Sequence, residues 1–418
     1  MATKIIRQKI VSKNFEIPNS HKIDVALQNG RYSTLDKAFS KDPQELIEMV
    51  KQSGLRGKGG GGAATGNKWQ FVTNKDGTKY VVVNADESEP GTFKDRQIME
   101  FDPHLLIEGI ITTCYALGSH VSYIYIRGEY EEITEVLQGA INEAYERNYL
   151  GDNAKYKVDI TVHRGAGAYI CGEKSALLES LEGNRGNPRL KPHSKTEPEW
   201  YFDQPTLVNN VETIATIPFI VENGAEGYRK FGTEKAPGTL LFAISGQINN
   251  PGVYEEQFGV NMLEFLETIG GGVKNGKKLK AVIPGGASTP IIPAHQIKDV
   301  TLDYECLWGF NSELGTGGMI VLDEDVCMVK TLKNLMRFYN HESCGQCTPC
   351  REGTSWSEKI LDRFMNKTAT LKDLETLKSV STIMNGKTVC VFAPAASGVI
   401  DGILRHFESE FLECIKWK

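Results

Sequence analysis

Short, continuous apolar runs alternate with helix-like patterns through the first half of the chain. The apolar runs lie at residues 80–84, 121–126 and 158–162. Helical patterns lie at residues 42–54, 129–149 and 172–181. Continuous apolar runs of this length are typical of strands that are buried on both faces. Their alternation with helices predicts an α/β fold, in which helices cover both faces of a mostly parallel sheet.

The pattern changes after residue 235 and again after residue 324. Strands at residues 239–245 and 279–283, with a short helix at residues 262–269, indicate a small α+β domain of the β-grasp type. From residue 325 onward, apolar residues recur at helical spacing, which predicts a bundle of four helices. We therefore expect three domains, at residues 1–235, 236–324 and 325–418.

Charge and hydropathy exclude several classes of protein. The 418 residues include 47 Lys and Arg against 53 Asp and Glu, a formal net charge of −6, whereas nucleic-acid binding needs a basic face. No apolar run approaches the roughly 20 residues that span a bilayer, so we expect no membrane insertion. The first fifteen residues lack the apolar core of a secretion signal. The chain is expected to be soluble and cytoplasmic.

Three of the nine cysteines fall within seven residues. Cys344, Cys347 and Cys350 form a C-x₂-C-x₂-C run, and Cys390 follows after 39 intervening residues. Iron–sulfur clusters need four thiolates, so this spacing predicts a [4Fe–4S] cluster with Cys390 as the fourth ligand and Cys414 as the second candidate. The alternative is a zinc site, although zinc is usually held by two separated cysteine pairs or by Cys with His.

A glycine-rich stretch at residues 54–62 is the first candidate for a ligand-binding loop. It contains G-x-G-x-x-G, but a helix precedes it where the dinucleotide fingerprint requires a strand. Consecutive glycines still let a flat or phosphorylated ligand approach the backbone. Arg56, Lys58 and Lys68 surround the stretch with positive charge. The alternative, a flexible linker, is disfavoured because Ser and Pro are absent from the stretch.

Polar residues follow the predicted strands at the ends where open α/β sheets bind ligands. The run 84–91 carries an amide and three carboxylates, which suit the edge of a flavin ring or a carboxamide. Residues 165–173 follow the third strand, and residues 209–213 open an apolar helix whose free N–H groups suit a phosphate. The alternatives are a solvated acidic turn for the first segment and plain N-capping by Asn for the last.

In chain order, these segments resemble the NADH-binding flavoprotein subunit (the F subunit) of respiratory complex I, NADH:quinone oxidoreductase. The resemblance runs from about residue 43 to residue 407. It implies a Rossmann-like FMN domain, a β-grasp domain and a four-helix bundle that holds one [4Fe–4S] cluster. It also implies that FMN takes hydride from NADH and that electrons pass singly to the cluster.

The resemblance also implies partners and a location. Electrons would leave to a small [2Fe–2S] thioredoxin-like subunit of the E type and a large iron–sulfur subunit of the G type. The complex would lie in the peripheral arm, on the cytoplasmic side of the inner membrane. Two rival functions are a diaphorase subunit of an NAD-linked hydrogenase or formate dehydrogenase, and a metal-stabilised electron-relay scaffold without nucleotide chemistry.

By the same resemblance, the cofactor and nucleotide contacts are spread over five segments. Asn209, Asn210 and Thr213 would hold the FMN phosphate, Lys191 would lie near the dinucleotide phosphates, and Glu89 near the carboxamide. Glu87 and Glu89 are the candidate catalytic residues, expected to matter more for hydride exchange than for folding. The other expected contacts are Gly54, Arg56, Gly57, Lys58, Gly59, Gly60, Gly62, Lys68, Asn84, Asp86, Ser88, Tyr169, Gly172, Glu173 and Lys174.

The chain departs from the family pattern at the adenosine end of the NADH site. Ala63 stands where we expect an aromatic residue, Lys174 where we expect an acid, and residues 193–202 differ from the usual proline-rich stretch. A cation beside the adenosine ribose accommodates a 2′-phosphate. Lys174 is therefore expected to relax discrimination against NADPH, unless it points to solvent.

Overall fold

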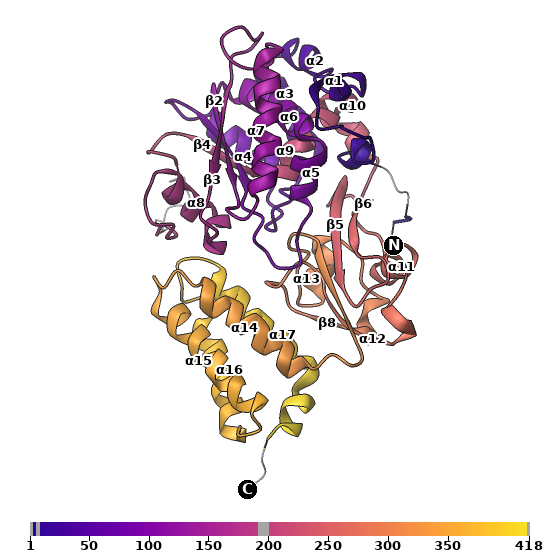
Figure 1. Ribbon diagram of the computed structural model, residues 1–418, viewed down its shortest axis with the longest axis vertical. Helices are drawn as coiled ribbons and strands as arrows, with labels where there is room; N and C mark the ends of the chain where they lie inside the picture. Colours follow the sequence, from indigo (N-terminus) through magenta and orange to yellow (C-terminus); the bar gives the residue numbers. More distant parts are fainter. Residues whose placement is uncertain (1–2, 6–8, 191–199, 416–418) are drawn as a thin grey trace.

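The computed structural model describes residues 3–5, 9–190 and 200–415, and Figure 1 shows three parts. A sheet surrounded by helices lies at the top, a second sheet lies below it on one side, and a helical bundle lies at the bottom. One hydrophobic cluster contains residues of all three parts, among them Val82, Ile283 and Tyr339. The three parts therefore share a common core where they meet.

The first sheet is wholly parallel, with the strand order β3-β2-β1-β4. Its strands are β1 (Tyr80–Ala85), β2 (Val121–Ile126), β3 (Asp159–Arg164) and β4 (Thr206–Asn210). The three predicted apolar runs form β1, β2 and β3, so the predicted α/β fold is confirmed. The sequence did not predict β4, because only Leu207 and Val208 are apolar in it.

Helices cover both faces of this sheet, because successive strand residues point to opposite faces. Val81 and Val83 pack in one cluster with apolar residues of the helices around α6, whereas Val82 packs with Leu177 on the other face. The larger helices are α3 (Pro43–Ser53), α4 (Thr65–Thr73), α6 (Pro103–Leu117), α7 (Glu131–Glu146), α8 (Lys174–Leu181) and α10 (Ile217–Arg229). The shorter ones are η1 (Ser12–Asn14), α1 (Ile23–Gln28), α2 (Leu35–Phe39), α5 (Asp95–Phe101), η2 (Tyr169–Gly172) and α9 (Val211–Ala215).

The helix before the glycine-rich stretch has the ends that its sequence predicts. The Asp42 carboxylate accepts a hydrogen bond from the Gln44 N–H (2.8 Å), and Pro43 is the first helical residue. Gly54 ends α3 in the left-handed conformation at φ 72°. This sharp end directs the chain into the glycine-rich stretch.

The second sheet is mixed, with the strand order β6-β5-β9-β7-β8. Its strands are β5 (Thr239–Gly246), β6 (Gly252–Gln257), β7 (Leu279–Ile283), β8 (Ile292–Pro293) and β9 (Gly318–Asp323). Only β5 and β9 pair in parallel, while the other neighbours are antiparallel. The helices of this part are α11 (Met262–Thr268), η3 (Lys274–Gly276), α12 (Ala294–Ile297) and α13 (Tyr304–Gly309). The arrangement agrees with the predicted β-grasp domain.

The start of the described chain lies against this second sheet. The N–H groups of Val11 and Ser12 donate to the Glu255 carboxylate on β6, at 3.1 and 2.8 Å. The Thr3 N–H donates to the Gly259 carbonyl at 2.8 Å. The first residues of the predicted domain 1–235 therefore contact the neighbouring part.

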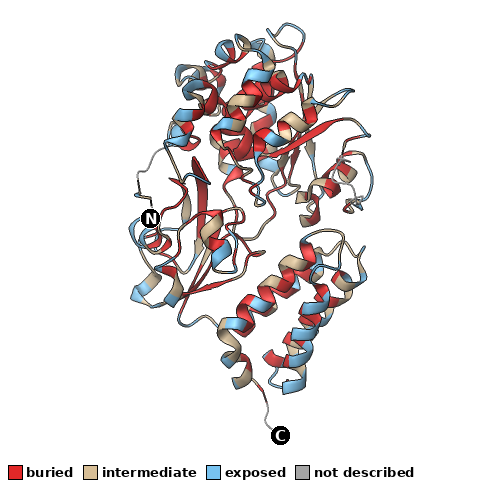
Figure 2. Cartoon of the chain, turned by 180° about the vertical axis from the view of Figure 1, so that it is seen from behind, coloured by how far each residue is buried: buried red, intermediate tan, exposed pale blue. Residues whose placement is uncertain are grey.

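Four helices form the last part, as the apolar spacing predicts. They are α14 (Met328–Glu342), α15 (Thr348–Met365), α16 (Leu371–Met384) and α17 (Phe392–Glu413). Val329, Leu332, Met336 and Tyr339 of α14 are all buried on the predicted face. Figure 2 shows that the buried faces of these helices turn toward one another.

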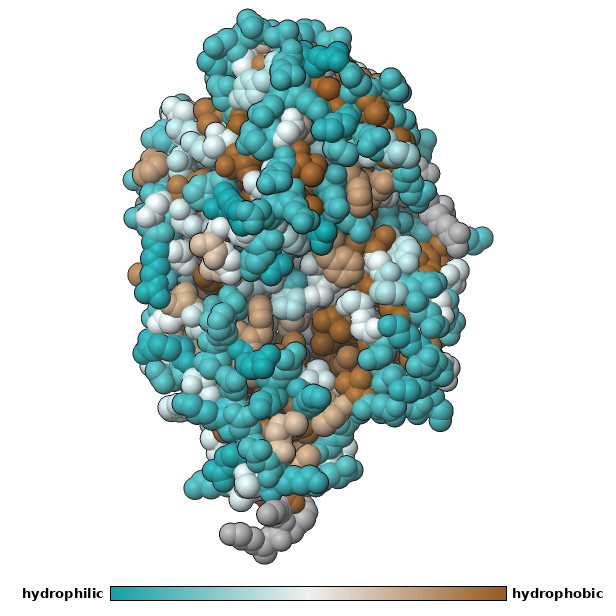
Figure 3. All heavy atoms as spheres, viewed as in Figure 1, coloured by the Kyte–Doolittle hydropathy of each residue, from teal (hydrophilic) through white to brown (hydrophobic). Residues whose placement is uncertain are grey.

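The surface is mostly polar. Figure 3 shows polar side chains over most of one side, with hydrophobic ones in separate patches, one of them near mid-height on the right. Within the described residues, we find no helix with the length and hydropathy of a membrane span.

Two helical glycines offer a test of how tightly the first domain is packed. A Cβ atom at Gly109 of α6 would lie 2.3 Å from the Ile214 carbonyl oxygen, whereas one at Gly139 of α7 would meet nothing within 4 Å. We expect Gly109→Ala to lower the free energy of unfolding by about 1–3 kcal/mol through overpacking. Gly139→Ala is expected to raise it by about 0.5–1 kcal/mol, since Ala favours the helix. Denaturant unfolding checks both, and equal effects would contradict the packing of α6 on α9.

Candidate functional site

A cavity of about 620 Å³ opens where the three parts meet. It begins at the carboxyl ends of β1 and β4, where ligands of open parallel sheets bind. The start of α17 and a loop of the second sheet complete its walls. The predicted residues that line it are Gly59, Gly60, Asn84, Asp86, Glu87, Ser88, Glu89, Tyr169, Gly172, Glu173 and Asn210.

The glycine-rich stretch presents its backbone to this cavity. A Cβ at Gly59 would press on the Asn210 side chain at 3.0 Å, and a Cβ at Gly60 would approach Thr316 at 3.8 Å. Gly61 has open space around it. The backbone can therefore come close to a ligand here, as the sequence predicted.

Asp86 is a buried carboxyl group at the end of β1. Burial raises its pKa from 3.8 to about 7, although the Ser88 hydroxyl and Arg127 favour the charged form. Its Oδ2 accepts a hydrogen bond from Ser88 at 3.1 Å. A carboxyl group with this pKa changes charge near neutral pH, which suits a site where charge develops on a ligand.

Glu87 lines the cavity, and its carboxylate also binds the start of α5. It accepts hydrogen bonds from three backbone N–H groups, those of Lys94, Asp95 and Arg96, at 2.8, 2.8 and 2.9 Å. The Tyr130 hydroxyl also donates to it at 3.1 Å. Burial and the neighbouring Asp95 raise its pKa to about 7. Glu87 thus has a direct structural role that the sequence did not reveal.

Glu89 connects the cavity to the other two parts. It accepts hydrogen bonds from the Tyr169 hydroxyl at 2.6 Å and from the Ser288 N–H at 2.7 Å. Tyr169 in turn packs edge-on against Phe392 at the start of α17. Burial raises the pKa of Glu89, against the effect of these two donors. Glu89 is therefore held between the second sheet and the bundle.

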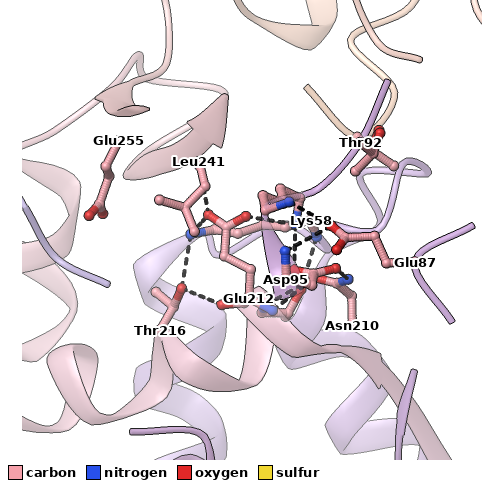
Figure 4. Close-up of polar contacts among 12 residues, drawn as sticks. Lys58, Glu87, Thr92, Asp95, Asn210, Glu212, Thr216, Leu241 and Glu255 are labelled. Carbon is pink, nitrogen blue, oxygen red and sulfur yellow. Dashed lines mark hydrogen bonds and ion pairs between the residues drawn. The ribbon is translucent and has the colours of Figure 1, made fainter. Parts of the chain in front are cut away.

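Beneath the cavity lies a buried ion-pair network, drawn in Figure 4. Lys58 Nζ lies 3.1 Å from Glu212 Oε1, and Lys94 Nζ lies 2.8 Å from Glu212 Oε2. Lys94 Nζ also lies 2.7 Å from Asp95 Oδ1, and the Asn210 side chain donates to Asp95 Oδ2 at 2.6 Å. The side chains of Lys58, Lys94 and Glu212 are completely buried. Asp95 and Asn210 link this network to the cavity wall.

The pKa values follow from this competition between burial and pairing. Burial alone would raise the pKa of Glu212, but Lys58 and Lys94 hold it below its ordinary value. Burial alone would lower the pKa of Lys94, but Asp95, Glu212 and Glu87 raise it above its ordinary value. Both groups are therefore charged at neutral pH, and each depends on the other.

Several predicted contacts do not line the cavity. Lys58 points into the ion-pair network, and Arg56 pairs with Glu305 at 2.7 Å while its guanidinium lies 3.9 Å from the Tyr304 ring. Lys68 donates to the Val208 carbonyl at 2.6 Å. Lys191 and residues 193–199 lie outside the described residues. The other predicted contacts outside the cavity wall are Gly54, Gly57, Gly62, Lys174, Asn209 and Thr213.

The predicted phosphate site at residues 209–213 includes a helix cap. The Asn210 side-chain oxygen accepts hydrogen bonds from the N–H groups of Glu212 and Thr213, at 3.0 and 3.4 Å. The Thr213 hydroxyl accepts from the Lys58 N–H at 2.9 Å, and Asn209 accepts from Trp69. Two helix-start N–H groups are therefore engaged in capping, and the role of Asn209, Asn210 and Thr213 in holding a phosphate stays a prediction.

The cavity wall also includes residues that no motif singled out. A glycine-rich run, Gly315 to Gly318, brings Gly315 and Thr316 to the cavity and resembles the loop at residue 59, so composition alone could have identified it. The remaining residues lack a comparable signal, because they come from loops, from η2 and from the starts of α5 and α17. They are Thr92, Asp95, Ile170, Ser288, Pro290, Glu313, Asn385, Val391, Phe392, Pro394, Ala395 and Gly398.

The four predicted cluster ligands surround a second, smaller cavity. Cys344, Cys347, Cys350 and Cys390 all line it, whereas Cys414 ends α17 elsewhere. The Ser343 hydroxyl lies 3.3 Å from Cys350 Sγ, and the Val389 N–H donates to Cys347 Sγ at 3.4 Å. Among the described residues, no three Cys, His, Asp or Glu converge on a single metal ion. All four thiols line this one cavity, and four thiolates are the ligand set of a multi-iron cluster.

Three known domain families match successive parts of the chain. Residues 50–219 match the Nuo51 FMN-binding domain, residues 240–321 the SLBB domain, and residues 330–414 the NADH-ubiquinone oxidoreductase-F iron-sulfur binding region. An F subunit of the NADH-quinone oxidoreductase of Rhizobium meliloti is 44% identical over 414 residues, which cover 98% of both chains. The F subunit of the Rhodobacter capsulatus enzyme is 48% identical over 397 residues, 94% of this chain and 92% of that one.

The chain belongs to the family of NADH-quinone oxidoreductase F subunits. It is an NADH-oxidising flavoprotein subunit whose cofactors are FMN and a [4Fe–4S] cluster. Among solved structures, a chain of NAD⁺-reducing [NiFe]-hydrogenase in the air-oxidised state matches with a TM-score of 0.84 and 32% identity. That match covers 99% of this chain and 69% of the hydrogenase chain.

The residues at the two cavities fit these cofactors. The volume of the larger cavity lies within the range of about 300–1,000 Å³ that is usual for cofactor sites. Its backbone approach at Gly59 to Gly61 and its polar groups at strand ends suit a phosphorylated flavin. The smaller cavity offers four thiols and sulfur-directed donors, the chemistry that an iron–sulfur cluster requires.

Removing the central charge of the ion-pair network tests its importance. Glu212→Gln leaves the buried Lys58 without its carboxylate partner and Lys94 with Asp95 alone, so we expect a loss of about 3–5 kcal/mol in the free energy of unfolding. The matched control is Asp36→Asn, which breaks an exposed pair with Lys155 and should cost at most about 1 kcal/mol. Denaturant unfolding measures both. A Glu212→Gln protein as stable as the control would show that the network is dispensable.

The raised pKa of Asp86 predicts a dependence of stability on pH. The unfolded chain releases this proton near pH 3.8, whereas the folded chain keeps it to about pH 7. Stability should therefore fall as the pH rises through this window. We expect Asp86→Asn to reduce the loss of stability between pH 4.5 and 7.5 and to stabilise the protein at pH 7.5 relative to the parent. The loss of stability that remains in this variant is expected to come from Glu87. Unfolding midpoints from pH 4.5 to 7.5 test this, and an unchanged slope would refute it.

Proposed function

We propose that the 620 Å³ cavity is where NADH gives hydride to FMN, and that electrons then leave singly through the cluster held by Cys344, Cys347, Cys350 and Cys390. One observation carries this proposal. The larger cavity and the cysteine cavity share part of their walls, since Cys390 lines both. Donor and acceptor sites are therefore adjacent within one chain.

FMN, when bound, accepts a two-electron hydride and releases electrons one at a time. The chain supplies binding and orientation for this chemistry. Gly59, Gly60 and Gly61 offer backbone to the cofactor, and Asn84 is fixed by donating to the Gly172 carbonyl at 2.9 Å. Lys58, which does not reach the cavity, would act through the ion-pair network beneath it.

Glu89 and Glu87 have different proposed roles in the reaction. Glu89 lines the cavity and fixes Tyr169, so it would place the carboxamide end of NADH and set the charge near the flavin. Glu87 would act chiefly by holding the start of α5 against the cavity floor. Because burial raises the pKa of Asp86 to about 7, Asp86 would hold or release a proton as charge develops on the flavin.

Lys174 is the first residue of α8 and follows Glu173, which does line the cavity. Its side chain is half-buried and does not belong to the cavity wall. The proposal that Lys174 lets the site accept NADPH therefore depends on its position in the sequence, next to Glu173. Comparing kcat/KM for NADH and NADPH before and after Lys174→Glu tests it.

We further propose the partners and the location that the family implies. Relatives are named as F subunits of NADH-quinone oxidoreductase, which supports membership of a complex I type enzyme. Within it, this chain would pass electrons to a small [2Fe–2S] subunit of the E type and a large iron–sulfur subunit of the G type. It would lie in the peripheral arm, on the cytoplasmic side of the inner membrane.

A diaphorase subunit of an NAD-linked hydrogenase is the second candidate. The TM-score of 0.84 with the NAD⁺-reducing hydrogenase chain favours it. However, identity with that chain is 32%, against 44% and 48% with the two F subunits of NADH-quinone oxidoreductase. The proteins that co-purify with this chain distinguish the two candidates.

The cluster assignment can be tested together with the function. We expect NADH to bleach the flavin absorbance of the purified complex and to produce the EPR signal of a reduced [4Fe–4S] cluster. Cys390→Ser should lose that signal and about four iron atoms per chain, since a cubane needs its four thiolates. Flavin should stay bound and reducible, because the cavity is built mainly by other residues.

Cys414→Ser is the matched control, since Cys414 lies away from the cysteine cavity. It should keep the signal and the iron. Loss of the cluster in Cys414→Ser, or its retention in Cys390→Ser, would reverse the ligand assignment. A parent complex in which NADH reduces no flavin would refute the proposed function and favour a scaffold without nucleotide chemistry.

A further inference from the structure

A single layer of side chains separates the two cavities. Three described residues line both of them, namely Ile170, Cys390 and Phe392. We refer to these three residues as the partition. Ile170 comes from η2 in the first domain, whereas Cys390 and Phe392 stand at the start of α17. The partition is therefore built by two domains that meet between the two cofactor sites.

Cys390 occupies a special place among the four cysteines. It reaches the larger cavity, whereas Cys344, Cys347 and Cys350 line only the smaller one in the described structure. Glu173, which lines the larger cavity, is also close enough to influence the Cys390 thiol electrostatically. Of the four proposed ligands, Cys390 is thus the one that faces the flavin side.

The other two members of the partition are apolar and nearly inaccessible. Ile170 is 7% exposed and Phe392 is 6% exposed. The Phe392 ring packs edge-on against Tyr169 and Tyr339, with centroids 5.7 and 5.2 Å apart. Tyr169 is fixed in turn by its hydrogen bond to Glu89. The Phe392 ring is therefore held in place on both sides.

We propose that electrons enter the cluster through Cys390 and that Phe392 and Ile170 are positioning residues, which set the gap between the two sites and keep water out of it. This inference rests on the proposed function. Oxidation of one NADH yields NAD⁺, one proton and two electrons. The electrons cross the partition one at a time, and each reduces the cluster by one electron before passing to the next acceptor. The proton would stay on the flavin side, because Phe392 and Ile170 offer no group to carry it and Cys390 would be held by the cluster as a thiolate.

Rapid-mixing experiments on the whole complex test this inference. Phe392→Leu and Ile170→Ala each change the partition from a different domain, so a folding defect in one leaves the other informative. We expect reduction of the cluster, followed by freeze-quench EPR, to slow several-fold relative to flavin reduction by NADH measured in the same variant. Iron content and the EPR signal after dithionite reduction should match the parent, which shows that the cluster itself is intact.

Phe338→Leu is the matched control. Phe338 packs on Tyr169 at 5.1 Å, much as Phe392 does, but it lines neither cavity. It should leave both rates unchanged. Parental cluster-reduction rates in the two partition variants, or equal slowing in Phe338→Leu, would overturn the inference. Failure of NADH to reduce flavin in the parent would instead refute the proposed function.

Discussion

The Glu212 carboxylate is paired with two lysines in a space that excludes water, and the cavity wall is built around it. Lys58 comes from the glycine-rich stretch and Lys94 from the loop before α5, while the Leu241 N–H of the second sheet donates to Glu212 at 2.9 Å. Buried charges are tolerated only when they are paired and hydrogen-bonded. The geometry of three separate segments is therefore tied to a single side chain.

Because of this pairing, the positive charges beside the glycine-rich stretch bind carboxylates of the protein. The ammonium group of Lys58 faces Glu212, and the Arg56 guanidinium lies on the Tyr304 ring and pairs with Glu305. These cations hold the stretch in shape from behind, while the glycines present their backbone in front. Glu87 behaves in a similar way. It lines the cavity, but its carboxylate is bound to the start of α5.

Local patterns in the sequence were sufficient for much of the fold and for the cluster ligands. The apolar runs marked β1 to β3, Asp42 and Gly54 marked the ends of α3, and the cysteine spacing selected four thiols that do surround one cavity. Local patterns could not show the direction of a side chain whose partner is distant. Lys58 and Glu212 are 154 residues apart, so the sequence indicated a charge but not its orientation.

The contact between the start of the chain and β6 has a consequence for the order of folding. The Val11 N–H and the Glu255 carboxylate that binds it are 244 residues apart in the chain. During synthesis, the N-terminal residues emerge first, long before their partner strand exists. The hydrogen bonds of Val11 and Ser12 to Glu255 can form only after β6 has left the ribosome. Docking of residues 11 and 12 on the second sheet is therefore a late step in folding. It requires that β6 has already formed.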